Sequence, residues 1–149
     1  MMEDWKNELD IYFREQKATK KEIKIKKERM KKAIKHFMQG EVIPAFDALK
    51  REFKKHKREI EVDSKKDWAA VLVKKNKHKE FVYEVNISID EGKLTASKKI
   101  YTINKKGKLK QRVEGKIHNP KNSPLLSSVK KEHIIKDFLE NYKDSTRVK

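Results

Sequence analysis

The chain has 149 residues, of which 42% are charged and 36% are hydrophobic, and its formal net charge is +17. It contains no cysteine, which excludes disulfides, thiolate metal sites and cysteine nucleophiles. No apolar run approaches the length of a membrane span, and the acidic start at Met1–Trp5 lacks the apolar region of a signal peptide. We therefore expect one soluble, cytoplasmic domain that spans residues 1–149.

The basic surplus consists mainly of lysine. Six of the 40 basic residues are arginine and the remaining 34 are lysine. Arginine is the usual residue for bidentate recognition of bases and phosphates, whereas lysine acts as a point charge. The composition therefore favours non-specific contact with a polyanion over sequence-specific reading. A surplus of this kind also occurs on surfaces where lysine serves only solubility.

Residues 1–17 are predicted to form an N-terminal helix. Trp5, Leu9, Tyr12 and Phe13 follow a helical spacing and give one apolar stripe. The charge of this segment differs from that of the rest, because residues 3–16 hold five acidic and two basic side chains. We expect the stripe to dock on the body of the protein or on a second copy of the chain.

A long kinked helix is predicted over residues 19–57. Thr19 and Glu22 have the spacing of a capping box, which marks a helix start and predicts a break at Lys17–Ala18. An alternative is one continuous helix with a coiled-coil seam. The seam would contain Leu9, Tyr12, Gln16, Thr19, Ile23, Lys26, Met30, Ala33 and Phe37. Three of these nine residues are polar, so we prefer the break.

Pro44 predicts a kink in the second helix. Proline has no backbone N–H to donate to the carbonyl of Gly40, and its ring crowds that group. The apolar spacing continues in phase through this point, which favours a kink over a full stop. The alternative is two helices that meet at 40–43, with Pro44 in the first turn of the second.

In residues 58–118 the apolar residues recur with a period of two, which is typical of strands. The short turns between these segments predict an antiparallel meander of five strands, at 58–63, 68–75, 80–89, 94–103 and 108–118. In the third strand, alternate residues from Phe81 to Ile89 are apolar, so one face should be buried. Burial then sets the register, which pairs Ile89 with Leu94, Ile87 with Ala96 and Tyr83 with Ile100. The same face is expected to continue through Ile100, Thr102, Leu109, Gln111 and Val113.

A C-terminal helix is predicted over residues 129–143, with Ser128 as its N-cap and a frayed tail at 144–149. The predicted fold class is therefore α+β. It combines an N-terminal helix, a long kinked helix, a five-stranded antiparallel meander sheet covered on one face, and a C-terminal helix.

Two basic surfaces are candidates for nucleic-acid binding. Residues 17–35 hold ten basic and two acidic side chains. Lysines near the start of a helix interact unfavourably with the helix dipole, so folding does not explain their presence there. On the solvent face of the sheet, Tyr101 is expected to lie among cations. Single-strand binders use such an arrangement, in which bases stack on the aromatic ring and the cations contact phosphates. The candidate residues are Lys20, Lys21, Lys24, Lys27, Lys31, Lys99, Tyr101, Lys108, Lys110 and Arg112. The competing explanations are a solvated helix and an edge hairpin whose lysines prevent aggregation.

No catalytic or metal-binding pattern is visible. The five histidines lack the i, i+4 spacing of a zinc site. The carboxylates are dispersed, and a chain with four glycines has no glycine-rich phosphate loop. We therefore expect a non-enzymatic protein without a metal or cofactor.

The sequence supports two hypotheses about function. The first is a small basic binding protein that contacts nucleic acid or another polyanion through the lysine-rich helix and the basic sheet face. The second is a protein–protein adaptor or homo-oligomer built through the N-terminal helices, with lysines that serve only solubility. Neither hypothesis involves a membrane partner.

Overall fold

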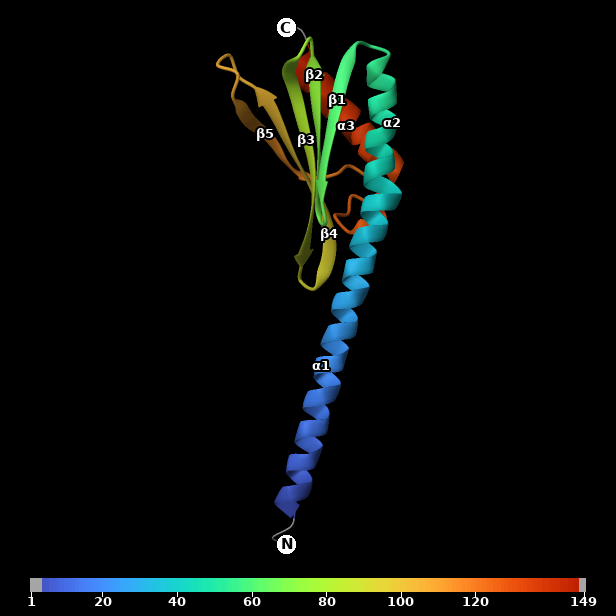
Figure 1. The fold of residues 1–149 in the computed structure, drawn as a ribbon, viewed down its shortest axis with the longest axis vertical. Coiled ribbons are helices and arrows are strands. Elements are labelled where there is room, and N and C mark those ends of the chain that lie inside the picture. Colours follow the sequence, from blue (N-terminus) through green and yellow to red (C-terminus); the bar gives the residue numbers. More distant parts are fainter. Residues whose placement is uncertain (1–3, 148–149) are drawn as a thin grey trace. The chain divides into compact units, whose positions relative to one another are not determined.

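The computed structural model describes residues 4–147 and confirms the α+β fold. The elements are α1 (Asp4–Phe37), the π-helical η1 (Met38–Val42), α2 (Ile43–Lys54), β1 (Arg58–Lys65), β2 (Trp68–Lys75), β3 (His78–Asp90), β4 (Lys93–Ile103), β5 (Leu109–Lys116), the 3-10 turn η2 (Leu126–Ser128) and α3 (Lys131–Thr146) (Figure 1). The chain forms two compact units, one ending at Ala33 and the other beginning at Ile34. Within 4–147, no helix has the length and apolar character needed to cross a membrane.

The predicted break at Lys17–Ala18 was wrong, because α1 runs without interruption from Asp4 to Phe37. Thr19 does not cap a helix start. Its hydroxyl donates instead to the carbonyl of Glu15, at 2.9 Å, as hydroxyl side chains inside helices do. The alternative of one continuous helix is therefore correct. The first three residues of the predicted 1–17 helix lie outside the described residues.

Near Pro44 the helix contains a π-helical segment rather than a stop. The N–H of Ile43 donates to the carbonyl of Met38, five residues earlier. The wider turn follows from the chemistry of Pro44, which cannot continue the α-helical pattern. Phe37 and Ile43 both keep helical dihedral angles, and Pro44 lies in the first turn of α2. The position of the irregularity was predicted, whereas its π-helical form was not.

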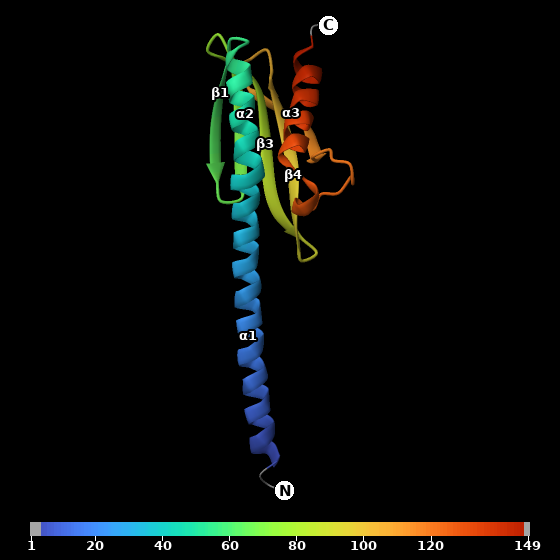
Figure 2. The ribbon, with the colours of Figure 1, turned by 90° about the vertical axis from the view of Figure 1, so that its right-hand side faces the viewer.

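The five strands pair in sequence order, β1-β2-β3-β4-β5, as an antiparallel meander. The predicted register between β3 and β4 is confirmed, since Ile89 pairs with Leu94, Ile87 with Ala96 and Tyr83 with Ile100. Figure 2 shows α2 and α3 on the same side of the sheet. These two helices close the core between themselves and the alternate, inward-facing residues of β2, β3 and β4.

The expected burial of β5 was wrong. Ile100 of β4 pairs with Val113, but the next residue, Tyr101, pairs with Gln111. The register therefore shifts at this point and skips Arg112 of β5. Such a bulge moves every residue beyond it to the opposite face of the sheet. Gln111 and Leu109 consequently leave the inward row, and every residue of β5 except Gly115 is exposed.

The start of α3 also differs from the prediction. Ser128 is buried in the turn η2, and the chain is extended at Val129 and Lys130 before α3 begins. Lys130 is the N-cap residue, and its backbone N–H donates to Nδ1 of His133 at 2.9 Å. The helix continues to Thr146, so residues 144–146 of the predicted frayed tail are helical, whereas 148–149 lie outside the described residues.

Phe138 of α3 is the centre of an aromatic cluster in the core and is fully buried. Its ring makes edge contacts with Phe53, Phe81 and Tyr83 at centroid distances of 5.6, 5.4 and 5.3 Å. It also stacks on Tyr142 at 6.1 Å. Because α2, β3 and α3 all contribute rings, this cluster joins the helical layer to the sheet.

We expect Phe138→Ala to lower the free energy of unfolding by about 3–5 kcal/mol, because it removes these contacts and leaves a cavity. Urea denaturation followed by circular dichroism measures the change. The matched control is Phe13→Ala on α1, where the side chain is 59% exposed, and a loss of no more than about 0.5 kcal/mol is expected there. Equal losses in both variants would contradict the assignment of Phe138 to the core.

Candidate functional site

The most polar feature of the core is an ion pair between Lys98 of β4 and Asp137 of α3. The ammonium nitrogen of Lys98 lies 2.6 Å from Oδ1 of Asp137, and both side chains are buried. The hydroxyl of Tyr83 donates to Oδ2 at 2.7 Å, and the backbone N–H of His118 donates to Oδ1 at 3.2 Å. Both carboxylate oxygens therefore have donors, as a buried charge requires.

Each of these two charges occupies an inward position of its own element. Lys98 occupies the inward row of β4 between Ala96 and Ile100, which are both fully buried. Asp137 lies on the apolar face of α3, three residues after Ile134. The sequence interpretation missed this pair. Its signal is one charge of each sign at an inward position of two elements that are otherwise apolar on that face.

The environment of Tyr83 keeps its phenol protonated. Burial raises the pKa of Tyr83 well above its ordinary value, and the negative charge of Asp137 and the hydrogen bond to it act in the same direction. The phenol is therefore a hydrogen-bond donor at neutral pH. Every member of the cluster has a hydrogen-bond partner, so the cluster serves to hold α3 against the sheet.

We expect Lys98→Met to cost about 3–5 kcal/mol of stability, because it leaves the carboxylate of Asp137 buried without its cation. The triple variant Lys98→Met/Tyr83→Phe/Asp137→Leu should lose less than the single variant, since it buries apolar groups in place of all three polar side chains. Urea denaturation of both variants compares the two losses. A triple variant that is less stable than the single variant would contradict this account.

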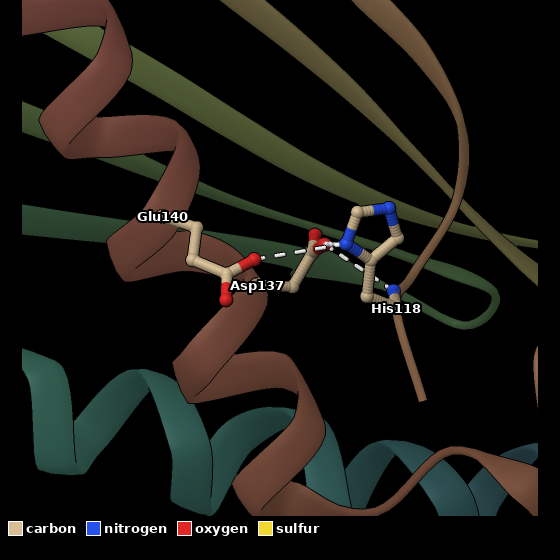
Figure 3. Close-up of side chains that lie close together, drawn as sticks. All are labelled: His118, Asp137 and Glu140. Carbon is tan, nitrogen blue, oxygen red and sulfur yellow. Dashed lines mark hydrogen bonds and ion pairs between the residues drawn. The ribbon is translucent and has the colours of Figure 1, made fainter. Parts of the chain in front are cut away.

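His118, Asp137 and Glu140 lie close together where β5 leads towards the loop before α3 (Figure 3). Nδ1 of His118 lies 3.8 Å from Oδ1 of Asp137 and 3.6 Å from Oε2 of Glu140. Side chains of these types can bind a divalent cation. Here Oδ1 of Asp137 already accepts from the ammonium of Lys98, whose positive charge would repel a metal ion at that oxygen. The arrangement fits an ion pair between His118, when protonated, and the two carboxylates better than a metal site.

Two open hollows lie where α2 ends and β1 begins. One has a volume of about 450 Å³ and is lined by Phe53, Lys55, His56, Lys57, Arg58 and Tyr142. The other has a volume of about 640 Å³ and is lined by Lys50, Lys54, Lys57, Arg58, Glu59, Ile60, Glu61 and Val62. Lysine and arginine supply half of each lining, which would suit an anion, but Glu59 and Glu61 also line the second hollow. The same cations also lie at a helix C-terminus, where the helix dipole favours them.

Arg58, Glu80 and Tyr142 form a second polar network beside the first hollow. Nε of Arg58 lies 3.5 Å from Oε1 of Glu80, and the hydroxyl of Tyr142 donates to the same carboxylate oxygen. Burial, followed by the hydrogen bond to Glu80, raises the pKa of Tyr142 to about 12. The network thus depends on a protonated tyrosine.

This network predicts a loss of stability at alkaline pH. The folded-state pKa of Tyr142 lies above the ordinary value of 10.0, so the unfolded chain loses this proton first as pH rises. The contribution of Tyr142 is complete below about pH 10 and lost by about pH 12, and it amounts to about 1–2 kcal/mol after allowance for partial exposure. Stability measured at pH 9 and pH 11 should therefore differ less in Tyr142→Phe than in the parent. Tyr12→Phe, which removes an exposed tyrosine of α1, is the control and should leave the difference unchanged.

The candidate residues of the lysine-rich segment all lie on α1 and are exposed. At about 100° per residue, seven of the nine basic side chains in 17–33 fall within a sector of about 140°. We call this sector the basic face of α1; it consists of Lys17, Lys20, Lys21, Lys24, Lys27, Lys31 and Lys32. Within the described residues, Lys31 is the one member that forms an ion pair, at 3.9 Å from Glu28.

The candidate residues on the sheet are not assembled as predicted. Lys99 is paired across the strands with Glu84 on one side and Glu114 on the other, so carboxylates flank it. The bulge pairs Lys110 with Thr102 and so puts it in the inward row, away from Tyr101. The remaining two, Lys108 and Arg112, are exposed, and Lys108 precedes β5. The sheet therefore does not present these residues as one stacking platform.

Comparison with known proteins identifies no relative of this chain: no family model, no curated protein and no solved structure matches it.

Proposed function

We propose that this protein is a small, non-enzymatic binder of polyanions, and of nucleic acid in particular, that acts through the basic face of α1. The observation that supports this most directly is the arrangement of the lysines. Seven of them share one sector of a regular helix, and six of those seven form no ion pair within residues 4–147. Lysines distributed only for solubility would not need to share one face.

Helix geometry gives this face a shape suited to an extended anion. From Lys17 to Lys32 it extends for about 22 Å, at 1.5 Å per residue. Lysines at i and i+4, such as Lys20 with Lys24 and Lys27 with Lys31, repel each other and destabilise an isolated helix. A row of phosphates along the face would remove that repulsion and release counterions.

The chemistry of the face predicts binding without sequence preference. Lysine supplies positive charge without the fixed fork by which arginine reads guanine, and it therefore tracks phosphates. An α-helix has the diameter that the major groove of a duplex admits. We therefore infer contacts to the backbone of a duplex, with affinity set by salt concentration and little affected by base sequence.

We expect the full chain to bind a 20–30 bp duplex at low salt with a slope of about −4 to −6 in a plot of log Kobs against log salt, because about five or six lysines contact phosphates. The variant Lys21→Gln/Lys24→Gln/Lys31→Gln should reduce the size of that slope by about three. Fluorescence anisotropy over a salt series measures both slopes.

The matched control is Lys65→Gln/Lys66→Gln/Lys93→Gln, which removes the same charge from exposed turns and strand ends of the sheet. Its slope should stay within about half a unit of the parent value. Equal slopes for the two triple variants would show that net charge, and not the face of α1, drives binding. Absence of binding at low salt would overturn the proposal itself.

A further inference from the structure

A second surface of α1 is mainly apolar, and its large side chains have no partner within the described chain. We call one line of residues along the helix the seam; its members follow one another by alternating steps of four and three residues. They are Trp5, Leu9, Tyr12, Gln16, Thr19, Ile23, Lys26, Met30 and Ala33. Its large side chains are exposed: Trp5 by 55%, Tyr12 by 54% and Ile23 by 50%. Steps that average 3.5 residues are the spacing by which two helices wind around each other.

The two flanks of this seam carry opposite charges. Glu15 and Glu22 lie beside the seam on one flank, and Lys20 and Lys27 lie beside it on the other. These opposite charges span two heptads of the helix. The equivalent flanking positions one heptad earlier are Glu8 and Phe13, and one heptad later they are Arg29 and Ile34. One helix thus presents both halves of a complementary surface.

We propose that α1 pairs with α1 of a second copy of this chain, parallel and in register, along the seam. In a parallel pair, a flanking residue that directly precedes a seam residue on one helix faces the residue five positions later on the other helix. Glu15 then faces Lys20 of the partner, and Glu22 faces Lys27 of the partner. The two-fold symmetry repeats each contact, so four ion pairs border the seam.

The charges favour the parallel orientation over the antiparallel one. Turning one helix end for end would bring like flanks together, with glutamates near glutamates and lysines near lysines. Charged residues at these flanking positions are known to set partner choice and orientation in helix pairs. Gln16, Thr19 and Lys26 are polar positions within the seam, and such residues specify register at a cost in affinity.

A second copy fits this surface better than a polyanion does. Phosphates would leave Trp5 and Tyr12 in water, whereas a second seam covers them. Pairing would also leave Lys21, Lys24 and Lys31 facing away from the partner, which keeps those lysines available. The inference does not depend on the proposed polyanion binding, and its test contains no nucleic acid.

The first experiment reverses the flanks in the full-length chain. Sedimentation equilibrium of the parent should show a dimer that dissociates on dilution. Glu15→Lys/Glu22→Lys and Lys20→Glu/Lys27→Glu should each weaken self-association by about tenfold or more, because four attractive pairs become repulsive. An equimolar mixture of the two variants should form dimers at least as strongly as the parent, which shows that each variant still folds.

The control for charge is Arg14→Glu/Lys21→Glu, because both residues lie on the side of α1 away from the seam. This variant alters the net charge as much as Lys20→Glu/Lys27→Glu does. Self-association no weaker than that of the parent is expected. A loss as large as that of the flank variants would mean that general charge governs association and would overturn the assignment to the seam.

The second experiment fixes the orientation and uses the absence of cysteine in the chain. Leu9→Cys places a thiol in the seam, so a parallel, in-register pair should form a disulfide between the two copies under mild oxidation. Asn7→Cys, on the side of the helix away from the seam, is the matched control and should cross-link much more slowly. Equal rates would overturn the pairing.

Two further outcomes would also overturn the inference. One is a parent chain that stays monomeric at every concentration tested. The other is preferential formation of a mixed disulfide between Leu9→Cys and Lys26→Cys chains, because that cross-link requires an antiparallel pair.

Discussion

The ion pair between Lys98 and Asp137 constrains how α3 meets the sheet, because both charges are buried. Two buried charges cost several kcal/mol each to remove from water, and only close geometry with further hydrogen bonds offsets this cost. The structure meets that condition, because the carboxylate accepts from an ammonium, a phenol and a backbone N–H. A displaced α3 would leave these charges buried without partners, so the pair disfavours other positions of α3 on the sheet.

The part of the molecule that the structure describes contains two kinds of charge, namely buried charges with partners and exposed lysines without them. In the sheet-containing unit, the buried or half-buried charges at Lys98, Asp137, Arg58 and Glu80 each have a partner of opposite sign. On the basic face of α1 the lysines are exposed, and only Lys31 has an acidic partner among the described residues. Unpaired exposed charge contributes little to the stability of a fold. The positive charge of α1 is accordingly the charge whose presence folding explains least.

Periodicity in the sequence was sufficient to predict the five strands, their order and the register of β3 with β4, because a one-residue slip there would expose an entire apolar row. It was not sufficient for β5, where one extra residue, Arg112, reverses the faces of the strand and no Gly or Pro marks the bulge. The Thr19 capping box failed because a hydroxyl can also bond to the carbonyl of Glu15 within a continuous helix.

The sites were harder to predict than the strands for a related reason. Lys98 and Asp137 are 39 residues apart in sequence, and only the docking of α3 brings them together. Neither residue is unusual among the lysines and acids of such a chain. The lysines of α1 needed no such docking, since helical spacing alone groups them. Sequence reasoning therefore grouped the lysines that local geometry brings together and missed the ion pair that depends on tertiary packing.

The buried lysine also has a consequence for the newly made chain. Synthesis at about 5–20 residues per second reaches Asp137 39 residues after Lys98, which takes about 2–8 s. During that time the meander can form hairpin by hairpin, while part of its apolar face still lacks α3. Lys98 is then a hydrated positive charge in the middle of that face, and a charge inside an apolar surface opposes its association with other chains. The position of Lys98 thus keeps a charge within the apolar face of the sheet before α3 covers that face.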